Sequence, residues 1–118
     1  MTYFEINKCK DRCNIAQGDP TWDDMLNSFG LAADQEVDAR LYETYAKNRH
    51  LFQIPVLPLP TPVDQSIRDA STNRVVAKWW RRQKDWDGSK ASMEESELAI
   101  TNYISRLKVD IVHYGTLV

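Results

Sequence analysis

One thirteen-residue segment, RVVAKWWRRQKDW at positions 74–86, constrains this chain more than any other. It holds three of the four tryptophans and five basic residues, and it contains no acid before Asp85. On a helix that turns by about 100° per residue, its apolar and cationic residues separate onto opposite sides. The apolar side is Val75, Val76, Trp79, Trp80 and Trp86, and the cationic side is Arg74, Lys78, Arg81, Arg82 and Lys84. We therefore predict an amphipathic helix that docks on other structure.

Size and composition are those of one small globular domain. The chain has 118 residues and 13.7 kDa, of which 42% are hydrophobic and 27% charged, so we expect a single helical domain over 1–118. No apolar run approaches the roughly 18 residues of a membrane span, and the stretch MTYFEINKCKDRC lacks the apolar core of a signal peptide. We expect a soluble chain without membrane contact, with reduced cysteines, and cytoplasmic unless it is part of a virion.

Helix signals dominate the first half of the chain. Asp19 as N-cap and Pro20 in the first turn predict a short helix that Gly30 ends, and a second helix is expected over about 33–49. The N-terminal segment 1–18 contains Tyr3, Phe4 and Ile6, which fit a short strand or a first helical turn equally well.

A proline-rich stretch, IPVLPLPTP at 54–62, follows these helices. Four prolines in nine positions forbid a helix and favour an extended crossing. Its apolar residues Val56, Leu57 and Leu59 are typical of a strap laid over the core, and a plain connection between helices is an equal alternative.

A long central helix is predicted next, with Thr61 and Pro62 at its start and Trp86 at its end. The apolar residues do not stay on one face of this helix. Those in its first part lie opposite the tryptophan side of its last part. This first group is Val63, Ile67, Ala70 and Ala77. Either the helix breaks at Ser71-Thr72-Asn73, which are poor helix formers, or it buries one face early and the other late. The second alternative describes a helix that passes from its own core to a partner's surface.

The C-terminal part is expected to hold one more helix and a tail. Asp87-Gly88 predicts a turn, and Ser92 with Glu95 matches the capping-box pattern, which predicts that the helix begins there. The core side of this helix is Met93, Ile100, Tyr103, Ile104, Leu107 and Ile111. Beyond about Lys108 or Gly115 the sequence permits an extended tail. The fold class that follows is all-α, a small helical bundle with a long central helix, a proline-rich extended crossing at 54–62 and an extended C-terminal tail at 109–118.

Catalytic and metal signatures are missing from the sequence. Cys9, Cys13, His50 and His113 could supply a zinc site on paper, but their spacing matches no common finger or ribbon. Asp110 and His113 are half of a carboxylate-bundle metal motif that lacks its second half. With four glycines in all and no nucleophile elbow, we expect no enzyme activity, no metal and no cofactor.

Charge is distributed unevenly, with six carboxylates and no Lys or Arg from Asp19 to Asp38. Three hypotheses follow for the cationic side of the 74–86 helix. It could grip DNA phosphates without sequence specificity, or it could meet the acids of an adjacent copy while the tryptophans anchor that contact. It could also be the solvated side of a core helix. The interface hypothesis involves eleven residues of these two segments. They are Trp79, Trp80, Trp86, Arg74, Lys78, Arg81, Arg82, Lys84, Asp34, Glu36 and Asp38.

The helix layout resembles the head-to-tail connector (adaptor) proteins of tailed bacteriophages over residues 19–118. The resembling elements are short N-terminal helices, a long helix from Val63 to Trp86, a second from Glu94 to Lys108, and an extendable tail at 109–118. The resemblance implies an assembly subunit of the virion neck that forms a ring under the portal.

By that resemblance the 74–86 helix would contact neighbouring subunits or line the lumen through which DNA passes. The tail would contact a larger viral protein such as the portal through Val109, Ile111, Val112, Tyr114 and Leu117. The proline-rich crossing has no place in the family pattern. Two other functions stay open, a small DNA-binding regulator that uses Arg81 and Arg82, and an acidic inhibitor of a host protein that uses residues 19–38.

Overall fold

The described part of the chain forms four helices. The computed structural model describes residues 2–47 and 57–115, with residues 108–115 described by their backbone alone. The helices are α1 (Ile6–Arg12), α2 (Asp23–Lys47), α3 (Gln65–Arg82) and α4 (Trp86–Gly115), and the described residues contain no strand. The predicted all-α class is therefore confirmed. No described helix has the length and apolar character that a membrane span requires.

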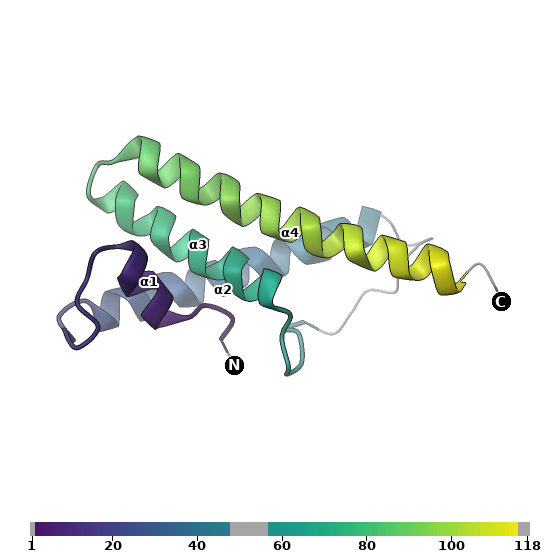
Figure 1. Ribbon diagram of the computed structural model, residues 1–118, viewed down its shortest axis with the longest axis horizontal. Coiled ribbons are helices and arrows are strands. Elements are labelled where there is room, and N and C mark those ends of the chain that lie inside the picture. Colours follow the sequence, from purple (N-terminus) through teal and green to yellow (C-terminus); the bar gives the residue numbers. More distant parts are fainter. Residues whose placement is uncertain (1, 48–56, 116–118) are drawn as a thin grey trace.

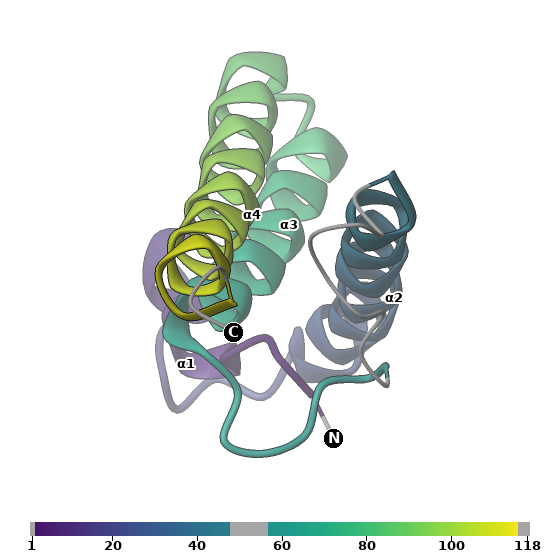
Figure 2. The same ribbon diagram turned by 90° about the vertical axis from the view of Figure 1, so that its right-hand side faces the viewer.

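α3 is the central helix of the bundle (Figures 1 and 2). α3 and α4 form an antiparallel hairpin, α2 lies on the other side of α3, and α1 crosses the region where α2 and α3 meet. Every side chain of α3 from Ala70 to Ala77 is buried, including polar ones. The helix is also continuous through Ser71, Thr72 and Asn73, which excludes the break that was one of the two alternatives from the sequence. Burial on all sides compensates for the low helix propensity of these residues.

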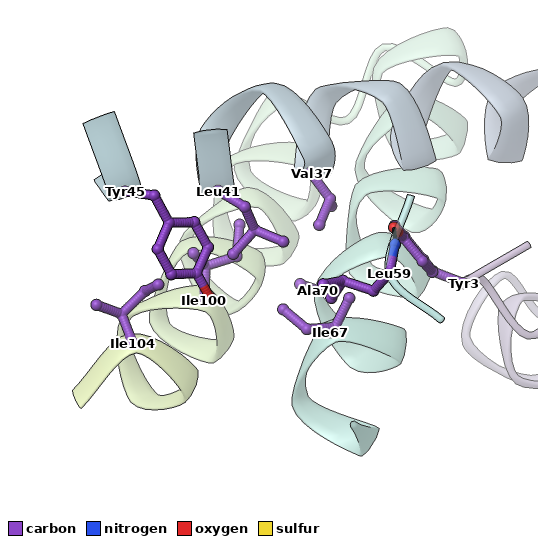
Figure 3. Close-up of a cluster of buried hydrophobic side chains, with 9 residues drawn as sticks. All are labelled: Tyr3, Val37, Leu41, Tyr45, Leu59, Ile67, Ala70, Ile100 and Ile104. Atoms are coloured by element: carbon purple, nitrogen blue, oxygen red, sulfur yellow. Dashed lines mark hydrogen bonds between the residues drawn. The ribbon is translucent and has the colours of Figure 1, made fainter. Parts of the chain in front are cut away.

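Two hydrophobic cores explain why the apolar face of α3 shifts. The first contains Ile67 and Ala70 from the start of α3, and the second contains Val75, Val76 and Trp79 from its end. Figure 3 shows how α2 and α4 close the first core. Its other buried members are Tyr3, Val37, Leu41, Tyr45, Leu59, Ile100 and Ile104. Both faces of α3 are thus buried inside this chain, and no partner surface is needed to explain the shift.

Gly30 lies inside α2 and does not end a helix there. The two helices predicted before residue 49 form one helix, Asp23–Lys47, and Asp19 accepts hydrogen bonds from Thr21 in the turn before it. A Cβ atom added at Gly30 would lie 2.1 Å from Cε1 of Phe4. Glycine is therefore required here for the close approach of an aromatic ring rather than for a helix end.

The α3–α4 turn begins four residues earlier than the predicted turn at Asp87-Gly88. α3 ends at Arg82, and Gln83, Lys84 and Asp85 make the turn, with Lys84 in the left-handed region at φ 62°. The Asp85 carboxylate accepts a hydrogen bond of 2.9 Å from the Gly88 amide, which is a helix cap. Trp86 consequently begins α4 instead of ending α3.

The C-terminal end of α4 differs from the predicted tail. The backbone is helical as far as Gly115, the later of the two ends considered from the sequence, so the expected extended structure is absent over 109–115. Residues 116–118 lie outside the described part of the chain.

The proline-rich crossing behaves as a strap over its described part, residues 57–62. It is not helical, Leu59 is buried in the first core, and Leu57 packs against that core. The amide of Leu59 donates a 2.7 Å hydrogen bond to the Tyr3 hydroxyl. Residues 54–56 lie outside the described residues.

A buried carboxylate fixes the N-terminal segment, which is neither strand nor helix over residues 2–5. The Asp34 carboxylate accepts hydrogen bonds from the backbone amides of Tyr3 (3.2 Å) and Phe4 (3.4 Å) and from the Ser71 hydroxyl (2.6 Å). The Tyr3 hydroxyl also donates a 2.6 Å hydrogen bond to Asp38. The first residues are thereby attached to α2, to α3 and to the strap.

The contact between Gly30 and Phe4 generates the first prediction. Gly30→Ala should lower the free energy of unfolding by about 1–3 kcal/mol because the Cβ overlaps the ring, although alanine is ordinarily the better helix former by about 1 kcal/mol. The measurement is chemical denaturation. Gly18→Ala is the matched control, since nothing lies within 4 Å of its added Cβ.

Removing the ring should reverse the sign of this effect. In a Phe4→Ala background, Gly30→Ala should become neutral or stabilising. If Gly30→Ala destabilises the protein equally with and without the ring, the overlap is not the cause.

The Asp38 carboxyl generates a prediction about pH. Its partial burial raises its pKa, and the neighbouring Asp34 adds to the increase, although the Tyr3 hydrogen bond acts in the opposite direction. A carboxyl with a raised pKa contributes stability that is present below its unfolded pKa and is lost as the pH rises through the folded pKa. Asp38→Asn keeps an acceptor for Tyr3, so it should gain stability relative to the wild type as the pH rises from about 4. Denaturation at acidic and neutral pH tests this, and an equal difference at both pH values would contradict it.

Candidate interaction surface

Three of the residues predicted to form an interface are internal. Trp79 is 7% exposed, Arg74 6% and Asp34 8%. Trp79 packs edge-on against the ring of Trp22, with centroids 5.4 Å apart, and Trp80 is half-buried against the same core. The central position of α3 turns Trp79 and Arg74 inward, and Asp34 of α2 is enclosed by the N-terminal amides and the Ser71 hydroxyl. An interface role for these three residues stays a prediction.

Arg74 joins three helices through ion pairs. Its guanidinium bonds to Glu97 of α4 and lies 3.8 Å from Glu36 of α2. Glu36 also pairs with Lys78 at 2.8 Å, and Glu97 also pairs with Arg40 at 3.1 Å. The acids of α2 and the cations of α3 thus meet within one chain at these positions. Asp38 is likewise engaged internally, by Tyr3.

Of the five cations in the 74–86 segment, the three exposed ones lie where α3 turns into α4. Arg81, Arg82 and Lys84 are exposed, and among the described side chains none of them forms an ion pair within 4.0 Å. The Arg81 guanidinium lies 5.8 Å from the ring centroid of Trp86, and that of Arg82 lies 5.6 Å from the ring of Trp22. These are cation–π distances, so the tryptophans orient the two arginines without neutralising them.

Trp86 is the prominent apolar feature of this region, with 61% of its surface exposed. Two open grooves lie beside it, and Arg81 lines both. The first, of about 710 Å³, runs between α2 and α3 and is lined by Met25, Ser28, Phe29, Ala32, Lys78, Arg81, Arg82 and Trp86. The second, of about 560 Å³, runs along α4 and is lined by Arg81, Trp86, Ser89, Lys90, Met93, Glu94 and Glu97. Apolar floors with charged borders of this kind suit a docked helix or peptide. We call Trp86, Arg81, Arg82 and Lys84 with these two grooves the junction surface.

Sequence reasoning missed the contribution of α2 and α4 to this surface. Met25 and Phe29 of α2 pack against the second core, and both also line the first groove. Their positions, with Phe29 four residues after Met25 and Ala32 three residues after Phe29, share one helix face, which was the available signal. Lys90 was not considered because the turn was predicted after Trp86.

The predicted tail contacts cannot be placed by side chain. Val109, Ile111, Val112 and Tyr114 belong to the helical backbone of α4, and their side chains are outside the described part, as is the whole of Leu117.

Reactive and metal-binding groups do not cluster in the described part of the chain. Among those residues no three His, Cys, Asp or Glu side chains are grouped for a metal ion, while His50 and the side chain of His113 lie outside them. Cys9 and Cys13 are free and buried. Burial raises the pKa of each thiol to about 12, which keeps both protonated and poorly nucleophilic.

Comparisons with known proteins found no similarity: no family model, no curated protein and no solved structure matches this chain.

The Arg74 ion pairs generate a prediction about stability. Glu97→Gln should lower the free energy of unfolding by about 1–3 kcal/mol, because a buried guanidinium loses its main charge partner; the partial exposure of Glu97 keeps the loss below that of a fully buried pair. Glu95→Gln, at an exposed site of the same helix, should change stability by less than about 0.5 kcal/mol. Equal effects of the two changes in urea denaturation would show that the Arg74 pair is not stabilising.

Proposed function

We propose that this protein is a structural assembly subunit that docks other protein chains through the junction surface. The main support for this proposal is Trp86, which is 61% exposed and lies between two grooves. The cations next to it lack an ion-pair partner among the described side chains. Tryptophan and arginine are the residues most enriched at the energetic centres of protein interfaces. An exposed tryptophan in a monomer leaves apolar surface in water. A contact that buries this surface gains hydrophobic stabilisation.

The narrower proposal is a head-to-tail connector of a virion neck, in which copies form a ring under a portal. Its support is the helix layout. α4 has 30 residues and α3 has 18, so the C-terminal turns of α4 run past the hairpin (Figure 1). A projecting helix end at residues 109–115 is an element that can reach a larger partner protein such as the portal. A location in the virion follows from this proposal.

The two other functions have lost part of their basis. A DNA-binding regulator would grip phosphates with five cations, but Arg74 is buried and Lys78 is paired with Glu36. Arg81, Arg82 and Lys84 are left for non-specific DNA contact. An acidic inhibitor would use Asp34, Glu36 and Asp38, and each of these carboxylates is engaged inside the chain.

Sedimentation of the full chain over a concentration series tests the proposal. The wild type should form oligomers, and Trp86→Ser should weaken association at least tenfold, which corresponds to about 1.4 kcal/mol. Tyr42→Ser is the matched control, since Tyr42 is also exposed but lies on α2 outside both grooves.

Binding of a labelled DNA duplex in the same samples distinguishes the alternative. A wild type that stays monomeric and binds DNA, with the salt dependence reduced in Arg81→Ala/Arg82→Ala, would replace assembly by DNA binding.

A further inference from the structure

Four residues of α4, each four positions from the next, form one ridge on the exposed side of the helix. They are Trp86, Lys90, Glu94 and Leu98. Trp86 and Leu98, at the ends, are 61% and 60% exposed, and the two residues between them are exposed and of opposite charge. The two apolar residues, Trp86 and Leu98, are therefore equally far from position 92 along the helix. The two residues of opposite charge, Lys90 and Glu94, are also equally far from it.

This pattern is self-complementary. When two identical helices run antiparallel with a two-fold axis that crosses the ridge at the height of position 92, positions 86 and 98 face each other, and so do positions 90 and 94. Trp86 of each copy then meets an apolar residue, and Lys90 of each copy meets a carboxylate. We propose that two copies of this chain associate through α4 in this antiparallel arrangement. The proposal deepens the assembly function proposed above and rests on it.

The groove along α4 supplies the shape that such a contact needs. It is lined by three residues of the ridge, Trp86, Lys90 and Glu94, and by Met93 at its apolar floor. Rows of residues spaced by four pack into the grooves of a partner helix when the two axes are inclined by about 50°. A ridge beside a groove on one helix face allows two copies to interdigitate. The exposed Ala91 next to the two-fold position adds little bulk.

Unsatisfied charge favours a second copy over an unrelated partner. Neither Lys90 nor Glu94 forms an ion pair within 4.0 Å among the described side chains. A lysine four residues before a glutamate is also the less favourable order for pairing within one helix. Pairing between copies satisfies both charges, and Arg81 beside Trp86 adds positive charge to the same end.

The proposed contact between the two α4 helices has two-fold symmetry and a small interface. A two-fold contact yields a dimer and no further growth, so a ring would need another surface, and the groove between α2 and α3 stays open for it. One helix from each copy buries less than about 1,200 Å² in total, so we expect a weak dimer with a Kd on the order of 10 µM.

Charge reversal tests the arrangement without disturbing the core, since both sites are exposed. Lys90→Glu and Glu94→Lys should each weaken self-association at least tenfold in sedimentation, because like charges then face each other. An equimolar mixture of the two single variants should form heterodimers, and the double variant Lys90→Glu/Glu94→Lys should dimerise like the wild type. Gln35→Lys, a charge change on the exposed face of α2, is the control and should leave association unchanged.

The outcomes separate this inference from the proposed function. If the wild type forms oligomers and both single variants keep them, or if the mixture does not restore association, the α4 pairing is wrong while self-assembly stands. If the wild type is monomeric at every concentration, the α4 pairing and self-assembly both fail.

Discussion

The buried carboxylate of Asp34 is the interaction on which the rest of the arrangement depends. It projects from α2 and accepts hydrogen bonds from the Ser71 hydroxyl of α3 and from two backbone amides of the N-terminal segment. A buried charge is stable only when such donors surround it. Held in this way, Tyr3 fills the first core and its hydroxyl anchors the strap at Leu59, while Phe4 reaches Gly30 in the second core. One side chain thus fixes the chain segments that close both cores.

The central position of α3 determines which charges are available for function. Because α2 and α4 flank it, Arg74 and Lys78 pair with carboxylates of the same chain. Apart from Arg12, which bonds to the neutral Asn73 side chain, the cations that are exposed and form no ion pair in the described part of the molecule belong to the last turn of α3, the α3–α4 turn and the start of α4. Trp86 lies among them because the turn precedes it. The segment that looks like one docking helix in the sequence is therefore divided into a structural part, up to Trp80, and a surface part after it.

Periodicity was enough to predict the helical class and the two opposite apolar faces of α3, and the apolar residues of the proline-rich stretch indicated a strap as one of two equal alternatives. It failed where a contact between distant residues decides the outcome. Gly30 resembles a helix end until Phe4 is placed against it, and Asp34 resembles a surface acid until the N-terminal amides surround it. The turn at Lys84 was missed because Asp87-Gly88 is the stronger local turn signal, whereas Asp85 caps the new helix. Local patterns cannot report these contacts, since the partner lies elsewhere in the chain.

The central claim is that the chain presents Trp86 for association while it keeps Trp79 for its own core. Hydroxyl-radical footprinting of the four tryptophans, in dilute and in concentrated solution, tests this claim most directly. The account predicts that Trp86 is oxidised rapidly in dilute solution and becomes protected as the concentration rises, while Trp79 is protected throughout. Rapid oxidation of Trp79, or equal oxidation of Trp86 at all concentrations, would contradict it.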